Sequence, residues 1–293
     1  MAMTTNRVLR TLLVALALLV ASLAVPAAPA RADETVAATN AVDAGTAAFA
    51  AATGGRGTLS VVVTPVQERT SGLQRPMAPD RTAAWVGNDL ADRPVLTASV
   101  VKLYVVADVL HRARTGALQL GPEDYRLLQS MIVRSDDCAM STAWDRWDGE
   151  QAVRDTAARY GLTGTRGPAQ AGQWGEAVTT AADVAQFLSA LPVVAAAPDA
   201  STLLLWMAIA APQGADGFDQ SFGLLSPAVD SGVLTGPAAK QGWMCCVDGT
   251  RHLHSVGVVD GWVVVLLGEM PTAIGWDAGR AALDAAAVAM LTV

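Results

Sequence analysis

The sequence predicts an α/β fold of the α+β type: an antiparallel sheet flanked by N- and C-terminal helices, with an inserted all-α domain. Three observations indicate this fold. Strand-like runs occur near both ends of the chain, at residues 57–67 and 239–270. About a hundred residues between them show the apolar period of 3.6 that is typical of helices. A final Ala-rich run, residues 275–293, predicts a closing helix.

The first 32 residues have the three parts of a secretory signal peptide. Two Arg and no acid occur in the first ten residues, an apolar run follows at residues 12–25, and Ala-Arg-Ala occupies residues 30–32. The apolar run is shorter than the roughly 20 residues of a membrane span. No Cys stands at the cleavage site to carry a lipid. We expect cleavage after Ala32 and a secreted, extracytoplasmic mature chain beginning at Asp33, with an uncleaved anchor as the alternative.

Composition and charge narrow the classes of partner. The 293 residues are 52% hydrophobic, which is ample for a large buried core. The net charge is −7, and removal of a leader with three Arg makes the mature chain −10. An acidic protein binds nucleic acid and anionic lipid poorly. We therefore expect a small-molecule or peptide substrate, no nucleic acid, no stable membrane insertion after signal cleavage, and a monomer.

The first elements follow from local composition. Residues 33–56 are rich in Ala, Thr and Gly and predict a helix or a tether. Residues 57–67, rich in Val and Thr, predict a strand, and residues 81–87 a weaker one. From Ala98 to about Arg114 apolar residues lie on all sides, which predicts a buried helix. Amphipathic helices are then predicted at residues 122–133, 138–147, 150–161, 180–191 and 200–211.

The end of the chain predicts a three-stranded meander. Its apolar runs, residues 239–247, 251–259 and 262–270, are separated by Asp248-Gly249 and Asp260-Gly261. Asp-Gly between such runs is a strong hairpin signal. The predicted domains are therefore a sheet domain and an inserted helical domain, with bounds 57–114 and 215–293 for the first and 115–214 for the second.

The Cys and His residues do not predict a metal site. Three Cys suggest one disulfide and one odd thiol in an exported protein. The pairing stays open, although a bridge between adjacent Cys245 and Cys246 is expected to be strained and therefore less favoured than one from Cys138. His252 and His254 share one face of a strand, and two His alone favour ordinary surface positions. We expect no metal and no cofactor.

A single Lys interrupts the buried helix. In "TASVVKLYVVADVL", Lys102 follows Ser99 by three residues, which places both side chains on one helix face. A buried amine beside a hydroxyl is typical of a nucleophile and its base; the ordinary alternative is a helix cap with a Lys that reaches out to solvent. The chain has 18 Arg and only two Lys, Lys102 and Lys240. Because Arg cannot serve as a base, the two Lys favour chemistry.

Three short motifs together resemble a known family. Ser99-x-x-Lys102, Ser135-Asp136-Asp137 and Lys240-Gln241-Gly242 resemble, in order and context, the S-x-x-K, S-D-N and K-T-G motifs of the penicillin-recognising serine hydrolases. The resemblance covers most of residues 57–293. The mature length and the closing helix resemble those of the class A β-lactamases. This resemblance implies a β-lactamase/transpeptidase-like fold.

The resemblance also implies a role for each motif residue. Ser99 would be the nucleophile, Lys102 its base and Ser135 the proton carrier to the leaving nitrogen. Lys240 would pair with the substrate carboxylate. The backbone N–H groups of Ser99 and Trp243 would form the oxyanion hole. The substrate would be bound by four residues: Asp137, Lys240, Gln241 and Gly242.

Several positions depart from the family pattern. Asp137 stands where the family has Asn, and Gln241 where it has Thr. The E-x-x-L-N motif that supplies the deacylating base is missing, and the corresponding loop, "GLTGTRGPAQAGQWGEAVTT", contains one acid, Glu176, at its far end. Two hypotheses follow. One is a serine hydrolase that forms an acyl-Ser99 intermediate with β-lactams or D-alanyl cell-wall peptides and deacylates slowly. The other is a non-catalytic module that binds cell-wall peptides or β-lactams.

Overall fold

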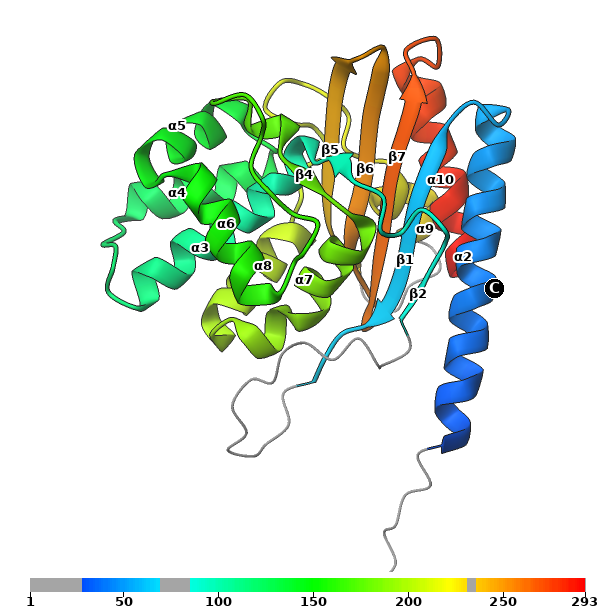
Figure 1. Ribbon diagram of the computed structural model, residues 1–293, viewed down its shortest axis with the longest axis horizontal. Coiled ribbons are helices and arrows are strands. Elements are labelled where there is room, and N and C mark those ends of the chain that lie inside the picture. The colour runs from blue at the N-terminus through cyan, green and yellow to red at the C-terminus, as the bar shows by residue number, and fades with distance from the viewer. Residues whose placement is uncertain (1–27, 69–84, 231–235, 293) are drawn as a thin grey trace, which may run out of the picture. The chain divides into compact units, whose positions relative to one another are not determined.

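A five-stranded antiparallel sheet forms the centre of the described part of the chain, residues 28–68, 85–230 and 236–292 of the computed structural model. The strand order is β2-β1-β7-β6-β5, so β7 is central and β5 is an edge strand (Figure 1). The strands are β1 (Thr58–Pro65), β2 (Val86–Gly87), β5 (Ala238–Val247), β6 (Thr250–Val259) and β7 (Trp262–Pro271).

The two Asp-Gly turns fix the register of the meander. Asp248 and Gly249 have φ of 49° and 72°, and Asp260 and Gly261 have φ of 46° and 84°. Positive φ at both central residues is the type I′ geometry, whose twist matches that of the flanking strands. The predicted meander of β5, β6 and β7 is confirmed, with antiparallel pairing from Ala238↔Val258 to Val259↔Trp262.

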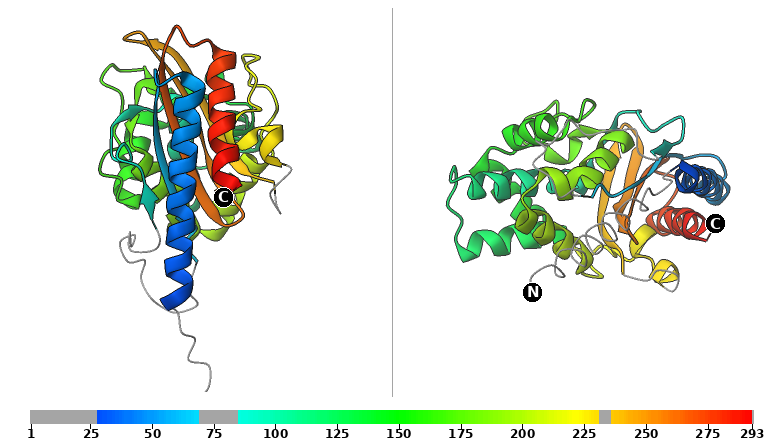
Figure 2. Two further views of the ribbon diagram at one scale, coloured as in Figure 1. Left: turned by 90° about the vertical axis from the view of Figure 1, so that its right-hand side faces the viewer. Right: turned by 90° about the horizontal axis from the view of Figure 1, so that it is seen from below.

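Two helices cover one face of the sheet. They are α2 (Ala28–Thr53) and α10 (Trp276–Leu291), which lie side by side in Figure 2. Small residues allow a close approach: a Cβ at Gly45 of α2 would lie 2.4 Å from the Met290 side chain of α10. Phe49, Leu266 and Leu283 belong to the apolar cluster between helices and sheet. The chain divides into two units, Met1–Glu34 and Thr35–Val293, and this packing lies within the second.

A block of helices covers the opposite face. Its long helices are α3 (Val101–Arg114), α4 (Pro122–Val133), α5 (Asp137–Trp147), α6 (Gly149–Tyr160), α7 (Ala181–Val194) and α8 (Ala197–Ala208). The predicted 3.6-residue patterns are confirmed at each of these positions. Buried on all sides from Val101 to Leu110, α3 shares an apolar cluster with the helices around it and with Val256 and Val265 of the sheet. The structure thus has the predicted α+β architecture.

The other elements of the described ranges are short and were less predictable. They are β3 (Val95–Leu96), β4 (Val178–Thr179), α9 (Pro227–Asp230) and the 3₁₀ turns η1 (Ala98–Val100), η2 (Trp174–Glu176) and η3 (Gly223–Leu225). Two-residue strands such as β3 and β4 carry no alternation that a sequence pattern can detect. The strand predicted at residues 81–87 is reduced to β2, and residues 81–84 lie outside the described residues. So do residues 1–27 of the predicted leader.

The structure corrects two expectations about Cys and His. Cys245 and Cys246 form the disulfide, and Cys138 is an exposed free thiol, so the preference for a bridge from Cys138 was wrong. Cys138 lies in α5, whereas the two adjacent cysteines occupy an irregular register between Met244 and Val247. The expected surface positions of His252 and His254 were also wrong. Both are buried. β6 packs against the turn η1 before α3, and His254 contacts the Leu96 carbonyl oxygen of β3.

No helix in the described ranges combines the length and the apolar composition that a bilayer crossing requires.

Candidate active site

Ser99 lies in a strained turn immediately before the buried helix α3. Ala98 has φ of 44°, a left-handed conformation that costs a non-glycine residue on the order of 1 kcal/mol. A hydrogen bond to a distant segment fixes the residue before the turn: the Thr97 backbone N–H donates to the Ala177 carbonyl oxygen at 2.7 Å. Strain that the surrounding structure maintains is typical of functional positions. The predicted helix thus begins with a tight turn that carries Ser99.

Lys102 is the centre of a hydrogen-bonded cluster. Its Nζ lies 2.7 Å from Ser99 Oγ, 2.8 Å from the Ser135 carbonyl oxygen and 2.6 Å from Asp137 Oδ1. The carbonyl and the carboxylate only accept hydrogen bonds, so each takes one N–H of the amine. The third position faces the Ser99 hydroxyl. An ammonium donates there, whereas a neutral amine presents its lone pair to the hydroxyl proton, which is the arrangement of a nucleophile and its general base.

Burial and charge act in opposite directions on Lys102. The side chain is fully buried, and this loss of solvation lowers the pKa of its amine below the ordinary 10.5. The Asp137 carboxylate opposes the shift, because it stabilises the ammonium. The net direction is downward. The environment therefore moves Lys102 toward the neutral form that a base requires.

Ser135 connects the two lysines. Its Oγ accepts a hydrogen bond from Lys240 Nζ at 2.7 Å and lies 3.4 Å from Lys102 Nζ. Ser135 has φ of 52° in the turn between α4 and α5, so it is a second strained residue in the cluster. Lys240 is 1% exposed, and burial together with the charge of Lys102 lowers the pKa of the Lys240 amine well below its ordinary value. A hydroxyl between two amines can pass a proton in either direction.

The edge strand β5 closes the cluster at Gly242. A Cβ on this glycine would lie 3.3 Å from Ser99 N and from the Thr97 carbonyl oxygen, so only glycine lets the strand approach this turn without displacing it. Trp243 is the next residue, which brings the two backbone segments predicted to carry the oxyanion hole next to each other. Its indole N–H donates to Asp216 Oδ2 at 3.0 Å, and its ring stacks on Phe218.

Gln241 is not brought into the cluster. Its amide nitrogen donates to the carbonyl oxygens of Gln220 and Phe222, and its side chain is 1% exposed. Neighbouring residues of a strand point to opposite faces, so Gln241 points away from the face that carries Lys240 and Gly242. Its contacts support the 220–222 segment, a role different from the predicted contact with a substrate carboxylate.

The first acid of the second motif has a structural contact as well. Asp136 Oδ1 accepts from Ala139 N at 3.0 Å and so caps α5, while its Oδ2 accepts from the Ser130 hydroxyl at 2.8 Å. Asp137 begins the helix and places its carboxylate on Lys102. The sequence placed Asp137 among the substrate contacts, and this ion pair with the base could not be read from the motif.

Trp174 is a site residue that the sequence did not single out. Lys102 Nζ lies 4.7 Å from the centre of its ring, and its indole N–H donates to Ser141 Oγ at 3.2 Å. Trp174 belongs to η2, and two residues of the same segment, Gly175 within η2 and Ala177 just after it, contact Thr97. The segment with Glu176 therefore lies along the nucleophile turn, with Trp174 facing the base. A lone aromatic residue in a Gly-rich loop was the available signal.

His254 supports the backbone just before the turn. Its Nε2 lies 2.8 Å from the Leu96 carbonyl oxygen, so Nε2 carries the proton and donates. Its Nδ1 is buried without a hydrogen-bond partner among the described residues. Burial, and to a smaller extent the neighbouring His252, lowers the pKa of His254 to about 3. His254 is thus a neutral side chain that positions β3 and the turn after it.

Because of His254, we expect the free energy of unfolding to fall as the pH decreases from 6.5 toward about 3. In that window His254 is protonated in the unfolded chain and neutral in the folded chain. The free energy of unfolding therefore falls by up to about 1.4 kcal/mol for each pH unit. His254→Gln keeps an N–H donor but cannot titrate, so its loss of stability with acid should be smaller. Urea unfolding of both proteins at several pH values measures this difference. Parallel curves would contradict the assignment.

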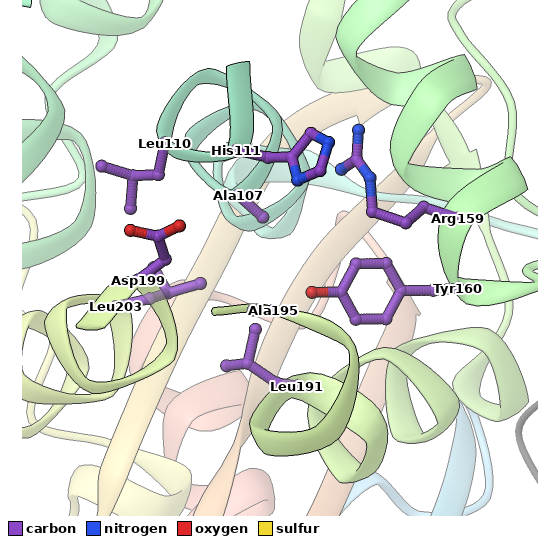
Figure 3. Close-up of a pocket in the computed structure, with 9 residues that line it drawn as sticks. All are labelled: Ala107, Leu110, His111, Arg159, Tyr160, Leu191, Ala195, Asp199 and Leu203. Carbon is purple, nitrogen blue, oxygen red and sulfur yellow. The ribbon is translucent and has the colours of Figure 1, made fainter. Parts of the chain in front are cut away.

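A separate small cavity lies away from this cluster, between α3, α6, α7 and α8 (Figure 3). His111, Arg159 and Tyr160 lie around it together with apolar side chains such as Leu191. Its volume is about 10 Å³, which is room for about one water molecule. It is therefore too small for a substrate, and Ser99 and Lys102 are the better candidates for chemistry.

Comparison with known sequences gives one group of relatives, and no family model matches the chain. The protein named "Putative lipoprotein LppW" in Mycobacterium tuberculosis and in Mycobacterium bovis is 33% identical over 189 residues. The match covers 61% of this chain and 57% of LppW, so the chain spans a little over half the length of these curated relatives.

Comparison with solved structures gives the fold. A β-lactamase from Sphaerobacter thermophilus matches with a TM-score of 0.61 and 18% identity, over 85% of this chain and 96% of that one. A β-lactamase from Chitinophaga pinensis matches with a TM-score of 0.61 and 13% identity, over 86% and 98%. A PBP-A mutant, in its acyl-enzyme complex with penicillin G, matches with 0.61 and 15%, over 85% and 95%. The chain therefore has a β-lactamase-like fold, as predicted.

Proposed function

We propose that this protein is an extracytoplasmic serine hydrolase whose Ser99 is acylated by β-lactams or D-alanyl cell-wall peptides. The observation that supports it most directly is the position of Lys102 Nζ, 2.7 Å from Ser99 Oγ and within 2.8 Å of two groups that only accept hydrogen bonds. The β-lactamase-like fold agrees with this chemistry. The leader-like first residues, and relatives named as lipoproteins, agree with an extracytoplasmic site.

The reaction begins with the Ser99 hydroxyl. As Ser99 Oγ bonds to the acyl carbon, its proton passes to Lys102 Nζ, and the carbonyl oxygen becomes negative. Backbone N–H groups at Ser99 and Trp243 stabilise that oxygen. When the carbon–nitrogen bond breaks, the leaving nitrogen takes a proton from Ser135, which regains one from the lysines through its contacts with Lys102 and Lys240. The product is an ester on Ser99 and a free amine.

A fluorescent penicillin tests this proposal. We expect the wild-type protein to retain the label on a denaturing gel and Ser99→Ala to lose it, because the label is an ester of Ser99 Oγ. Ser201→Ala is the matched control, since Ser201 is an exposed serine of α8. Equal labelling of wild type and Ser99→Ala would rule out Ser99 as the nucleophile.

The second candidate function is a binding module of the same fold. The contact of Asp137 Oδ1 with Lys102 favours it, because a carboxylate at 2.6 Å stabilises the ammonium rather than the base. Ser99 is also only 4% exposed. A binding module would bind a D-alanyl peptide reversibly in calorimetry and would take no covalent label from the penicillin.

A further inference from the structure

The Asp137 carboxylate lies next to the reacting atoms and is open to solvent. The same amine, Lys102 Nζ, contacts Asp137 Oδ1 at 2.6 Å and Ser99 Oγ at 2.7 Å. The carboxylate is therefore within two hydrogen-bond lengths of the nucleophile. Its side chain is 62% exposed, whereas that of Lys102 is fully buried. An acyl group on Ser99 must pass its substituents close to this carboxylate.

Asp137 is also the acid of this region with an unused oxygen. Asp136 is occupied by Ala139 N and Ser130 Oγ, and Asp216 accepts from the Trp243 indole and from a backbone N–H. Asp137 Oδ2 has no hydrogen-bond partner among the described residues. A carboxylate only accepts hydrogen bonds, so it repels a carbonyl oxygen and attracts a donor with a positive charge.

We propose that Asp137 makes the site selective for acyl donors whose acylamino side chain, attached to the carbon next to the scissile acyl group, carries a protonated primary amine. This inference rests on the proposed function and specifies its substrate class. An ammonium there donates a charge-assisted hydrogen bond to the carboxylate. When the acyl donor has an uncharged substituent at this position, Asp137 stays paired with Lys102 alone.

The same contact connects substrate binding to the base. Asp137 is the carboxylate in direct contact with Lys102, and the other charges around it are Lys240, Asp136 and Asp216. When a substrate ammonium shares the carboxylate, Asp137 stabilises the Lys102 ammonium less. Lys102 then gives up its proton more readily, and it accepts the Ser99 proton in the next step. The preferred substrate thus contributes to its own activation.

Two penicillins that differ by one amino group test the proposal. Benzylpenicillin and its α-amino derivative ampicillin compete with the fluorescent penicillin at about pH 6, where an α-amino group is protonated. We expect the wild type to be acylated about two- to fivefold faster by ampicillin, the range for an exposed ion pair. Asp137→Asn should remove this preference, and Asp137→Glu, which keeps the charge, should restore part of it.

A second acid on the same helix provides the control. Asp145 is exposed on α5, so Asp145→Asn removes one charge without touching the cluster and should leave the preference unchanged. Thermal unfolding checks that both proteins are folded. If wild type and Asp137→Asn are both acylated and show the same preference, the inference about Asp137 is wrong and the proposed function still stands. Acylation of the wild type by neither penicillin would overturn the proposed function, and this inference with it.

Discussion

Replacing Lys102 by Arg should slow acylation of Ser99 by about 10²- to 10⁴-fold, the usual contribution of a positioned general base. Arg keeps a positive charge opposite Asp137 but stays protonated at every accessible pH. The contacts of Lys102 with Ser99 Oγ and the Ser135 carbonyl would then hold a permanent donor. Stopped-flow measurement of acylation by a chromogenic β-lactam gives the rate constants.

Two further variants separate chemistry from folding. Lys102→Met fills the buried site without charge or base, so it should fold and be equally slow. Arg126→Lys makes the converse exchange at the exposed ion pair with Glu123 and should acylate at the wild-type rate. The pH profile adds a third measurement, because the wild-type rate should fall as the pH drops below the lowered pKa of Lys102. Acylation of Lys102→Arg at a rate near wild type would remove Lys102 from the mechanism.

A β-lactam should remain attached to Ser99 for minutes or longer. Deacylation is a separate attack by water, and water needs its own general base, worth about 10²- to 10⁴-fold in rate. Of the nearby acids, Asp136 caps α5 and Asp137 contacts Lys102. On η2 the side chain that faces the base is Trp174. Intact-mass spectrometry after mixing with a penicillin should therefore show an adduct and little free product.

Glu176 is the residue to change alongside this measurement. The backbone around it contacts Thr97, which brings the segment closer to the site than its distance along the chain from Ser99 suggests. If the carboxyl takes no part, Glu176→Gln should leave the lifetime of the adduct unchanged. Rapid turnover of the wild type with no detectable adduct would contradict the prediction, and a longer lifetime in Glu176→Gln would identify the missing base.

The parts of the fold that local patterns specify could be predicted well. The apolar period located the helices of the block, and Asp260-Gly261 located the last turn, because each depends on neighbours in the chain. The motifs located Ser99, Lys102, Ser135 and Lys240, and the structure brings these four side chains together.

The remainder depends on contacts between distant segments. The ion pair of Asp137 with Lys102 requires the packing of α5 against the start of α3, which no spacing in the sequence specifies. Trp174 reaches the base because β3 and β4 pair, and each is only two residues long. His254 looked like a surface residue because an alternating strand does not reveal which of its faces is covered. In each of these cases the position of the residue depends on which distant surfaces pack together.

The pairing of β1 with β7 has a consequence for how the chain reaches this structure. Thr58 lies opposite Glu269, so β1, the first long strand, can pair only after β7 near the end of the chain has been made. Contacts between such distant residues form slowly, because a long loop has to close before they stabilise anything. Until then the Val-rich β1 has an unpaired edge that can pair with other chains. Production of this protein should therefore depend on protecting the nascent chain, and truncation before β7 should lead to aggregation rather than to a smaller folded domain.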